Sequence, residues 1–487
     1  MNIAIAGAGF VGVVHAAAMA SQEHKVVLFD VNESRINSLI DFCEGRTEEL
    51  YIHEAGLSSL LKESYKKGLL EFTTNTKEAV SRSLVIFNCV GTPRGPDGKA
   101  DLTYVESVAT ECGKVLQTNP GYKLFVNKST VPVGTAKRVE DIIHEYYTGD
   151  FDVASNPETL AEGRAVRDAT LPKRIIVGVN SIRGKKLFHD IYAPFFLPQQ
   201  EKIFYMSPES AELTKYACNS FLGTQVVLTN ILANIAKRTG ANWRDMVPAI
   251  LADVRIGKFV HPGLGFGGSC FRKDISQISH SIKDVDGSSK DIDFIHSLLI
   301  QNEHQKLEIN RNLHKAYPNG IKGLHLAVWG LSFKKDTNDI RDAASLEVIP
   351  SLLARGVIVH AHDPKGIEEF KDEMARVGVD VTNCSFFTDK YQAIEGCDGL
   401  LILNDWKTYK QPDFNTLREK LKRKIIYDGK DLLNYRSIID EADFSYYSIC
   451  RPDILAKVRE DSVLTLNNDE TINYSQVIDK VDVDLYV

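Results

Sequence analysis

The sequence of 487 residues lacks several features that would assign a protein to a class by composition alone. Its eight cysteines include no Cys-x-x-Cys pair and no regular spacing, which argues against a disulfide framework and a zinc site. No uninterrupted apolar run reaches the ~18 residues that a membrane-spanning helix requires. We therefore expect a soluble protein of the reducing cytoplasm, with no resident metal ion and no membrane partner.

The chain also lacks an excess of positive charge. Its formal net charge is −7, so no broad basic field is present to attract nucleic acid. The length exceeds that of one typical core and predicts two or three domains. The first twenty residues are apolar, yet they contain three glycines and His15 and no positively charged start. We read them as part of the fold and not as a signal peptide.

The opening residues contain a glycine-rich turn between a strand and a helix. A strand over residues 2–6 runs into Gly7-Ala8-Gly9-Phe10-Val11-Gly12, the G-x-G-x-x-G pattern of dinucleotide-binding folds. The next strand ends at Asp30, near the usual spacing for an acid that hydrogen-bonds a ribose 2′-OH. A carboxylate there would repel a 2′-phosphate, so the sequence predicts NAD rather than NADP. A glycine-rich turn in another α/β domain is the alternative.

Further strand-like runs at 83–90, 123–129 and 174–179 alternate with helical patterns, which predicts a parallel sheet. Ligands of such sheets bind beyond the carboxyl ends of the strands. Thr92 and Thr130 follow two of these strands, and their hydroxyls are suited either to ligand contacts or to plain turn chemistry.

Residues 155–163, SNPETLAEG, are typical of a helix start. Asn156 would be the N-cap and Pro157 the first helical residue. Glu158 and Glu162 would then lie four apart on one face. Such acids commonly complement the helix dipole, and they are also placed where a general base could be held.

A continuous helical pattern from 208 to 238 predicts a rod of roughly 45 Å, suited to joining domains or to a dimer interface. Lys215 and Asn219 share one of its faces, which could equally be a solvated face. The helical pattern continues to about 315, with a glycine-rich interruption at 257–269. Cys270 follows that interruption and precedes Lys273-Asp274, and it is either a small buried side chain or a reactive thiol.

A second α/β unit begins after the linker 317–323. Strands are expected at 323–330, 357–364, 399–405 and 423–430, with a helix at 342–356. This half lacks G-x-G-x-x-G. It carries Lys334, Lys335 and Arg341 after a strand, which suits a nucleotide diphosphate other than the dinucleotide.

The motifs GAGFVG, STVPVGT, NPETLAEG, AELTKYACNSFLG, RIG, GFGGSCFRKD and GLSFKKDTNDIRD occur in one order. In this the chain resembles the UDP-glucose 6-dehydrogenase family of nucleotide-sugar dehydrogenases over roughly residues 1–450. The resemblance implies two Rossmann-like parallel-sheet domains joined by a long central helix and a helical dimerisation domain. The expected boundaries are 1–204 for the NAD-binding domain, 205–316 for the central domain and 317–487 for the UDP-sugar-binding domain.

The resemblance also implies chemistry. Oxidation of a primary alcohol to an acid removes two hydrides, and a thiol can hold the aldehyde between them as a thiohemiacetal and then a thioester. Cys270 would be that thiol. Lys215 and Asn219 would stabilise an oxyanion, and Lys215 would also favour the thiolate. Asp274 and Glu162 would position or activate water, through Thr130, while Glu158 would help to hold the substrate, UDP-glucose.

The remaining roles follow from the same resemblance. Arg255 would reach the substrate of a neighbouring subunit, which makes a homodimer the expected minimum. The residues implied for NAD binding are Gly7, Gly9, Phe10, Val11, Gly12, Asp30, Arg35, Thr92, Thr130, Glu162, Lys273 and Arg341. Those implied for the substrate are Glu158, Lys215, Asn219, Arg255, Phe259, Gly267, Phe333, Lys334 and Lys430.

Some residues depart from the family's pattern. Thr159 stands where an aromatic residue is usual, and Lys430 replaces an arginine, so a point charge takes the place of a bidentate fork. Residues 452–487 match no known pattern. The alternatives are a dehydrogenase of GDP-mannose or of a UDP-N-acetylhexosamine, a single-hydride dehydrogenase of a hydroxy acid, and a non-catalytic protein that binds NAD and a nucleotide sugar.

Overall fold

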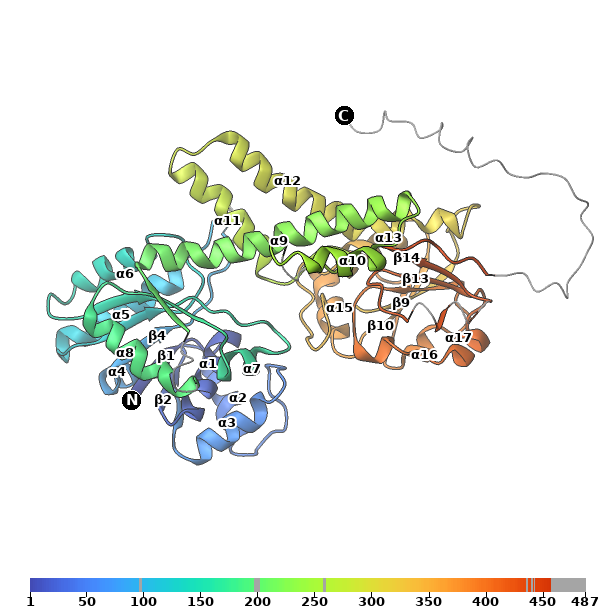
Figure 1. Ribbon diagram of the computed structural model, residues 1–487. Coiled ribbons are helices and arrows are strands. Elements are labelled where there is room, and N and C mark those ends of the chain that lie inside the picture. The colour runs from blue at the N-terminus through green and yellow to red at the C-terminus, as the bar shows by residue number, and fades with distance from the viewer. Residues whose placement is uncertain are drawn as a thin grey trace, which may run out of the picture.

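The computed structural model describes residues 1–95, 99–196, 202–256, 260–434, 437–438, 441 and 443–456. Two α/β units lie at opposite ends of the long helix α9 (Pro208–Arg238), the first blue to green and the second orange to red in Figure 1. This arrangement confirms the predicted fold class. Most of the segment 452–487 lies outside the described residues.

The first unit is built on a sheet whose described strands have the order β3-β2-β1-β4-β5-β6-β7-β8. The strands are β1 (Asn2–Ala6), β2 (Lys25–Phe29), β3 (Leu70–Thr73), β4 (Val85–Asn88), β5 (Leu124–Asn127), β6 (Asp152–Ser155), β7 (Ile175–Gly178) and β8 (Ile203–Met206). Neighbouring strands are parallel, except that β6 and β7 meet antiparallel at Ser155 and Gly178. The predicted parallel sheet is therefore confirmed, with this single antiparallel pair as its exception.

Helices cover both faces of this sheet. They are α1 (Phe10–Ser21), α2 (Glu33–Cys43), α3 (Leu57–Lys66), α4 (Thr76–Arg82), α5 (Thr103–Thr118), α6 (Thr135–His144), α7 (Ala165–Thr170) and α8 (Ile182–Tyr192). Two separate apolar cores result, one on each face. The chain order reverses between β1 and β4, which is the switch point where ligands of such sheets bind.

The second unit repeats this plan with the described strand order β11-β10-β9-β12-β13-β14, all parallel. Its strands are β9 (His325–Trp329), β10 (Ile358–His362), β11 (Cys384–Phe387), β12 (Gly399–Ile402), β13 (Ile425–Asp428) and β14 (Ser445–Ser448). Its helices are α14 (Ser345–Ala354), α15 (Ile367–Arg376), α16 (Lys390–Ala393) and α17 (Phe414–Lys420).

Helix α9 connects the two units, as the unbroken helical pattern predicted. Its first turns pack on β6 and β7, whereas Ala233 and Ala236 near its end belong to the core of the second unit. Its middle packs against α11 (Phe271–Asp284) and α12 (Ser289–Lys306), which share a small apolar core with it. The remaining central helices are α10 (Trp243–Ala252) and α13 (Glu308–Arg311).

The predicted helix start at 155–163 was wrong. Helix α7 begins at Ala165, and residues 156–161 form an irregular loop. Asn156 does not cap a helix because its side chain is buried among tertiary partners: its amide donates to the Ile176 carbonyl, 2.6 Å away. Tertiary hydrogen bonds therefore override a local capping pattern, and Glu158 and Glu162 do not share a helical face.

Two further expectations concern the chain as a whole. All eight cysteines are among the described residues, and each is a free thiol. None of the helices formed by the described residues has the length and apolar character that a membrane span needs.

Candidate active site

The glycine-rich turn follows β1 and leads into α1. Gly7 has a φ of +102°, which favours glycine, and a side chain on Gly12 would begin 1.9 Å from the Gly7 carbonyl oxygen. At Gly9, the N-cap of α1, a side chain would meet open space. Gly7 and Gly12 therefore close the turn on itself, and Gly9 leaves its outer surface clear for a pyrophosphate at the helix N-terminus.

Asp30, at the end of β2, is fixed beside this turn. Its carboxylate accepts hydrogen bonds from the backbone N–H of Ala8 at 2.6 Å and of Asn32 at 2.8 Å. Tyr51 donates to the Ala8 carbonyl at 2.7 Å, so the turn is held from both sides. Asp30 stays half-buried, which leaves its carboxylate accessible to a ribose diol. The residues fit the adenosine half of NAD.

Cys270 lies at the N-cap of α11, on the segment between the two sheet units. Its backbone carbonyl accepts from the N–H of Asp274 at 2.8 Å, and its Sγ is 3.4 Å from Ser269 Oγ. The side chain is exposed in the single chain. The sequence therefore placed the thiol correctly before a helix, and its alternative as a buried hydrophobe was wrong.

Two buried pairs lie next to this thiol. Lys215 Nζ donates to Glu158 Oε1 at 2.7 Å, and both side chains are 9% exposed. Asn219, one helical turn later on α9, donates to Asp274 Oδ2 at 2.6 Å. The alternative reading of Lys215 and Asn219 as a solvated face was wrong, because their shared face is turned into the site.

The charges of these pairs oppose the cost of burial. Burial alone would raise the pKa of Glu158, but Lys215 and Lys128 hold that pKa below its usual value. The pKa of Lys215 is raised in turn, because Glu158 outweighs the effect of burial. The pKa of Asp274 is raised, chiefly by burial.

The thiol itself is protonated more readily than a free cysteine. Although Cys270 is exposed to solvent on one side, the protein atoms around its sulfur reduce its hydration and raise the pKa of the thiol, and Glu158 and Asp274 add to the shift. Ser269 and Lys215 act in the opposite direction. The expectation that Lys215 would favour a thiolate holds for its own contribution and is wrong for the net effect, because Glu158 neutralises its charge.

The predicted threonines lie on the side of the site that faces the first sheet. Thr92 donates from its hydroxyl to the Thr130 carbonyl at 2.9 Å. Lys273 reaches across from α11 and is 3.4 Å from both the Thr92 hydroxyl and the Asp274 carboxylate. Thr92, Thr130 and Lys273 therefore connect the carboxyl ends of β4 and β5 to the helix that carries Cys270.

Glu162 lies between the two units. Its Oε1 is 3.4 Å from Arg341, which also binds Asp339 at 2.6 Å. Burial, reinforced by Asp339, raises the pKa of Glu162 to about 7, and Arg341 acts against it. A carboxyl group with such a pKa can exchange protons near neutral pH. The sequence did not single out Asp339, because nothing along the chain relates it to Glu162, although its ion-pair partner Arg341 is only two residues away.

The loop after β9 forms the opposite wall. The Gly268 N–H donates to the Arg341 carbonyl at 2.7 Å, and a side chain on Gly268 would begin 2.9 Å from the Phe333 ring. Gly267 is similarly close to Phe333 and Asp342. These glycines are therefore packed against protein.

Basic residues line the same side. The pKa of Lys334 is lowered by burial, while Glu162 and Glu54 favour its charged form. Lys335 is paired with Asp405 at 3.2 Å. Lys430, after β13, lies along Gly263 on the segment that leads to the cysteine. These lysines suit the phosphates of a nucleotide.

Two predicted residues remain outside this cluster. Arg255 is exposed, and its guanidinium pairs with Asp253. Arg35 is exposed in the first turn of α2, where its backbone N–H donates to Asn32. Phe259 lies outside the described residues.

Lys128 is a residue that sequence reasoning missed. It is buried directly after β5, and its ammonium donates to Asn156 Oδ1 at 3.0 Å and to the Tyr192 hydroxyl at 3.5 Å. Burial lowers its pKa to about 8, against the attraction of Cys89 and Glu158. The only signal in the sequence is a lysine at the end of an apolar strand.

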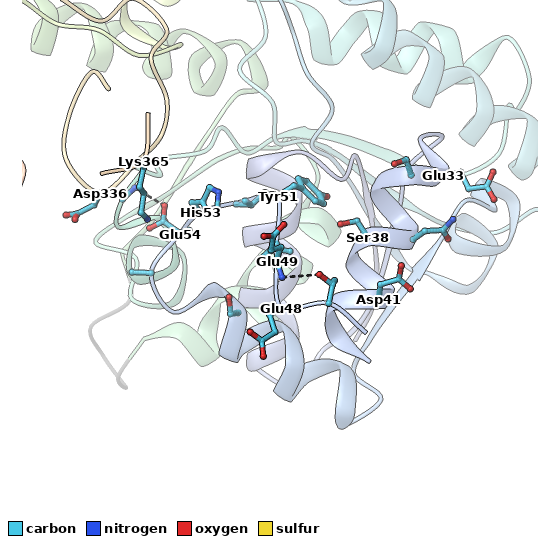
Figure 2. A pocket seen from close by; sticks show the side chains of 18 of the residues that line it. Glu33, Ser38, Asp41, Glu48, Glu49, Tyr51, His53, Glu54, Asp336 and Lys365 are labelled. Carbon is cyan, nitrogen blue, oxygen red and sulfur yellow. Dashed lines mark hydrogen bonds between the residues drawn. The ribbon is translucent and has the colours of Figure 1, made fainter. Parts of the chain in front are cut away.

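A cleft of about 1450 Å³ opens beside the dinucleotide turn, between the first and second units. Figure 2 shows Tyr51, His53 and Glu54 along one wall, with Asp336 and Lys365 of the second unit above Glu54. Glu54 accepts from the N–H groups of Gly163 and Ala165, both at 2.8 Å, and so fastens the loop that carries Glu162.

Comparison with known proteins bears on each part of the chain. Residues 1–196 match the NAD binding domain of the UDP-glucose/GDP-mannose dehydrogenase family, residues 209–303 its central domain and residues 327–435 its UDP binding domain. These matches confirm the predicted NAD cofactor and the resemblance drawn from the motifs.

Individual relatives agree with these matches. The chain is 37% identical to UDP-glucose 6-dehydrogenase TuaD of Bacillus subtilis, over 93% of this chain and 94% of the relative. It is 35% identical to a UDP-glucose 6-dehydrogenase of Pseudomonas aeruginosa, over 93% and 98%. The solved UDP-glucose dehydrogenase of Pyrobaculum islandicum superposes with a TM-score of 0.80 at 32% identity, covering 92% of this chain and 97% of that one. With its two Rossmann-like units and the cysteine between them, the chain belongs to the UDP-glucose/GDP-mannose dehydrogenase family.

Proposed function

We propose that this protein oxidises UDP-glucose to UDP-glucuronate in two steps, with NAD as the acceptor of both hydrides. The observation that supports this most directly is the group formed by Cys270, Lys215, Asn219 and Asp274 between a dinucleotide turn and a second, lysine-lined sheet end. A single-hydride dehydrogenase needs no thiol there. The named relatives at 35–37% identity are UDP-glucose 6-dehydrogenases.

In the first oxidation the primary alcohol at carbon 6 of the glucose would lose a proton to a base and a hydride to the bound cofactor, which would leave an aldehyde. When bound, NAD supplies the hydride acceptor, and the turn at Gly7–Gly12 with Asp30 would hold it. Lys215 and Asn219 lie where they can donate hydrogen bonds to the sugar oxygen as charge develops on it. Glu158 keeps Lys215 in the required orientation.

In the second oxidation the Cys270 sulfur bonds to the aldehyde carbon and gives a thiohemiacetal. Loss of its hydroxyl proton to a base and of a hydride to a second NAD would convert this adduct to a thioester, and water would then cleave the carbon–sulfur bond to release the acid and regenerate the thiol. The raised pKa of Cys270 means that its proton must leave during the attack. Asp274, buried and hydrogen-bonded to Asn219, lies one helical turn from the thiol and is placed to assist that transfer.

We further propose that the protein acts as a homodimer. Helix α9 exposes an apolar stripe that consists of Phe221, Leu228, Ile231, Leu232 and Ile235. An exposed stripe of this length on one helix is suited to a second copy of the same helix. Gln225 on α9 donates to the Ile256 carbonyl at 2.8 Å, so Arg255 lies beside the stripe. From there its exposed guanidinium could reach the site of the second subunit. The free cysteines are consistent with a cytoplasmic location.

The stoichiometry of NADH formation tests the proposed reaction. Limiting UDP-glucose, taken to completion with excess NAD, should yield two NADH for each UDP-glucuronate. A ratio of one would indicate a single-hydride dehydrogenase, and no NADH would leave only a binding protein. The same assay with GDP-mannose and UDP-N-acetylhexosamines tests the choice of sugar.

A further inference from the structure

The two sheet units repeat the same turn after their first strands, with one difference. Gly7 donates its N–H to Phe29 in the first unit, and Gly330 donates to His362 in the second, each at 2.8 Å. Gly330 also has a positive φ of +107°, close to the +102° of Gly7. The turn that binds a dinucleotide in the first unit is therefore present in the second, although the glycine motif is not.

The acid at the end of the second strand also recurs. Asp30 accepts from Ala8 N–H at 2.6 Å, and Asp363 accepts from Leu331 N–H at 2.7 Å. Each acid accepts again from a backbone N–H two residues further on, Asn32 or Lys365. Asp363 therefore occupies the position that Asp30 has in the first unit.

The surroundings of the two acids differ completely. Asp30 is half-buried, whereas Asp363 is 2% exposed. Five more donors surround the Asp363 carboxylate at 2.9 to 3.3 Å, and they are the Ser332 N–H and hydroxyl, the Gly366 N–H, the Asn404 amide and the Trp406 indole. No ribose can approach a carboxylate that is enclosed in this way.

These donors come from the loops that build the nucleotide-sugar side of the site. Leu331 and Ser332 lead directly to Phe333 and Lys334, and Asn404 precedes Asp405, the partner of Lys335. Phe333 in turn packs against Gly268 of the cysteine segment. Asp363 itself does not contact Phe333, Lys334 or Lys335 through the hydrogen bonds described above; it binds the residues that precede them in their loops.

We propose that Asp363 is a positioning residue for the nucleotide-sugar side of the active site. It joins the loop after β9 to the loop after β12, and thereby sets where Phe333, Lys334 and Lys335 stand. This inference rests on the proposed function, because it assumes that those residues face a uridine nucleotide. In this unit the acid that could have bound a ribose has become the fixed centre of the loops that bind the substrate.

The test separates positioning from simple support of the fold. Asp363→Asn in the full chain keeps the size of the side chain and removes its charge. One carboxylate oxygen, which accepts hydrogen bonds, is replaced by an NH₂ group, which can only donate them and would face the same donors. UDP, which needs no turnover, is the probe for calorimetric titration. We expect its Kd to rise at least tenfold while the Kd of NAD changes less than twofold. The KM for UDP-glucose should rise in parallel while the KM for NAD does not.

Asp398→Asn is the matched control. Asp398 is also 2% exposed and accepts a strand N–H, that of His325 at 3.0 Å, but it precedes β12 at the opposite edge of the same sheet. The Asp398→Asn substitution should lower the melting temperature and leave the Kd of UDP within twofold of the wild-type value. Equal loss of UDP binding in both variants would overturn the proposal, because it would reflect general weakening of the unit.

A milder pair covers the case in which Asp363→Asn does not fold. Trp406→Phe removes one donor to Asp363, and Trp329→Phe removes an indole bond to the Lys390 carbonyl in the same unit. Only Trp406→Phe should weaken UDP binding, about threefold. Unchanged UDP binding in well-folded Asp363→Asn or Trp406→Phe would overturn the proposed role of Asp363 and leave the proposed function of the protein untouched. Failure of the wild-type chain to bind UDP would refute the proposed function and the inference together.

Discussion

Lys215 Nζ and Glu158 Oε1 form a buried ion pair at 2.7 Å, and the exposed pair of Lys137 and Asp141 on α6 has the same separation. The two pairs differ in burial: the side chains are 9% exposed in the first and about 60% exposed in the second. Because the two pairs have the same N–O distance and differ in solvent exposure, the effect of burial on an ion pair can be measured within one chain.

Lys215→Met should destabilise the protein by about 3–5 kcal/mol, because it leaves the Glu158 carboxylate buried without its partner. The double variant with Glu158→Gln should recover much of that loss. Lys137→Met should change the free energy of unfolding by less than about 1 kcal/mol. Urea denaturation measures these changes in the free energy of unfolding. In addition, kcat should fall by about 10²-fold or more in Lys215→Met, both alone and in the double variant. Normal turnover in either would exclude Lys215 from oxyanion stabilisation.

The thiol of Cys270 can be tested by separating the two oxidations. Cys270→Ala should form no UDP-glucuronate. Cys270→Ser should react about once per site, because its hydroxyl can trap the aldehyde but leaves an ester that hydrolyses more slowly than a thioester. Intact-mass spectrometry should then show a sugar-nucleotide adduct that maps to residue 270.

Cys218→Ser supplies the control for this experiment. Cys218 is a free, half-buried cysteine on α9, and its replacement should leave turnover unchanged with no adduct. Near-normal production of UDP-glucuronate by folded Cys270→Ala would remove the thiol from the mechanism.

Asp30→Ala should raise the KM for NAD about tenfold or more, since the hydrogen bonds to the ribose diol are lost. The KM for NADP should fall relative to that for NAD, because the charge that repels a 2′-phosphate is gone. Initial rates with each cofactor measure both effects. Asp141→Ala, which removes an exposed acid on α6 away from the cleft beside the dinucleotide turn, should alter neither value. A wild-type chain that used NADP as well as NAD would contradict the role of Asp30.

Lys128 predicts a pH dependence of stability with a definite sign. Its pKa in the folded chain is about 8, below the ordinary value of 10.5. Between these pH values the unfolded chain holds a proton that the folded chain has released, so the stability of the wild type rises with pH. Lys128→Met removes this dependence, and Asn156 keeps its hydrogen bond from Tyr192 at 2.6 Å.

The comparison between the two proteins isolates this one group between pH 8 and 10.5, because Glu158 and Cys89, whose pKa values Lys128 also affects, titrate below and above that range. The wild type should gain roughly 3 kcal/mol relative to Lys128→Met between pH 8 and 10.5. Chemical denaturation at a series of pH values gives the difference directly. Parallel curves would mean that Lys128 titrates normally in the folded chain.

The features that the sequence predicted well depend on local pattern. The glycine turn with Asp30, the helix from 208 to 238 and the placement of Cys270 before a helix all follow from spacing along a short stretch of chain. The roles of the site residues came from the family resemblance and remain proposals.

The features that the sequence did not predict depend on contacts between distant residues. The capping pattern at Asn156 was misleading because Lys128, Ile176 and Tyr192 compete for that side chain. Asp363 was visible only as the end of a strand, since its donors in the loops after β9 and β12 lie 31 to 43 residues away. Hydrogen bonds of that range leave no periodic trace in a sequence.

Cys270 stands on neither sheet, and its segment is fitted to the second unit by the Gly268–Arg341 hydrogen bond and by the contact of Gly268 with Phe333. In a chimera that took its carboxyl-terminal domain from a relative with another nucleotide preference, the loop after β9 would therefore no longer fit the segment that carries Cys270. Residues 260–270 would have to be exchanged together with that domain. The carboxyl-terminal domain is therefore not an independent module, and a change of nucleotide specificity requires matching changes in that domain and in residues 260–270.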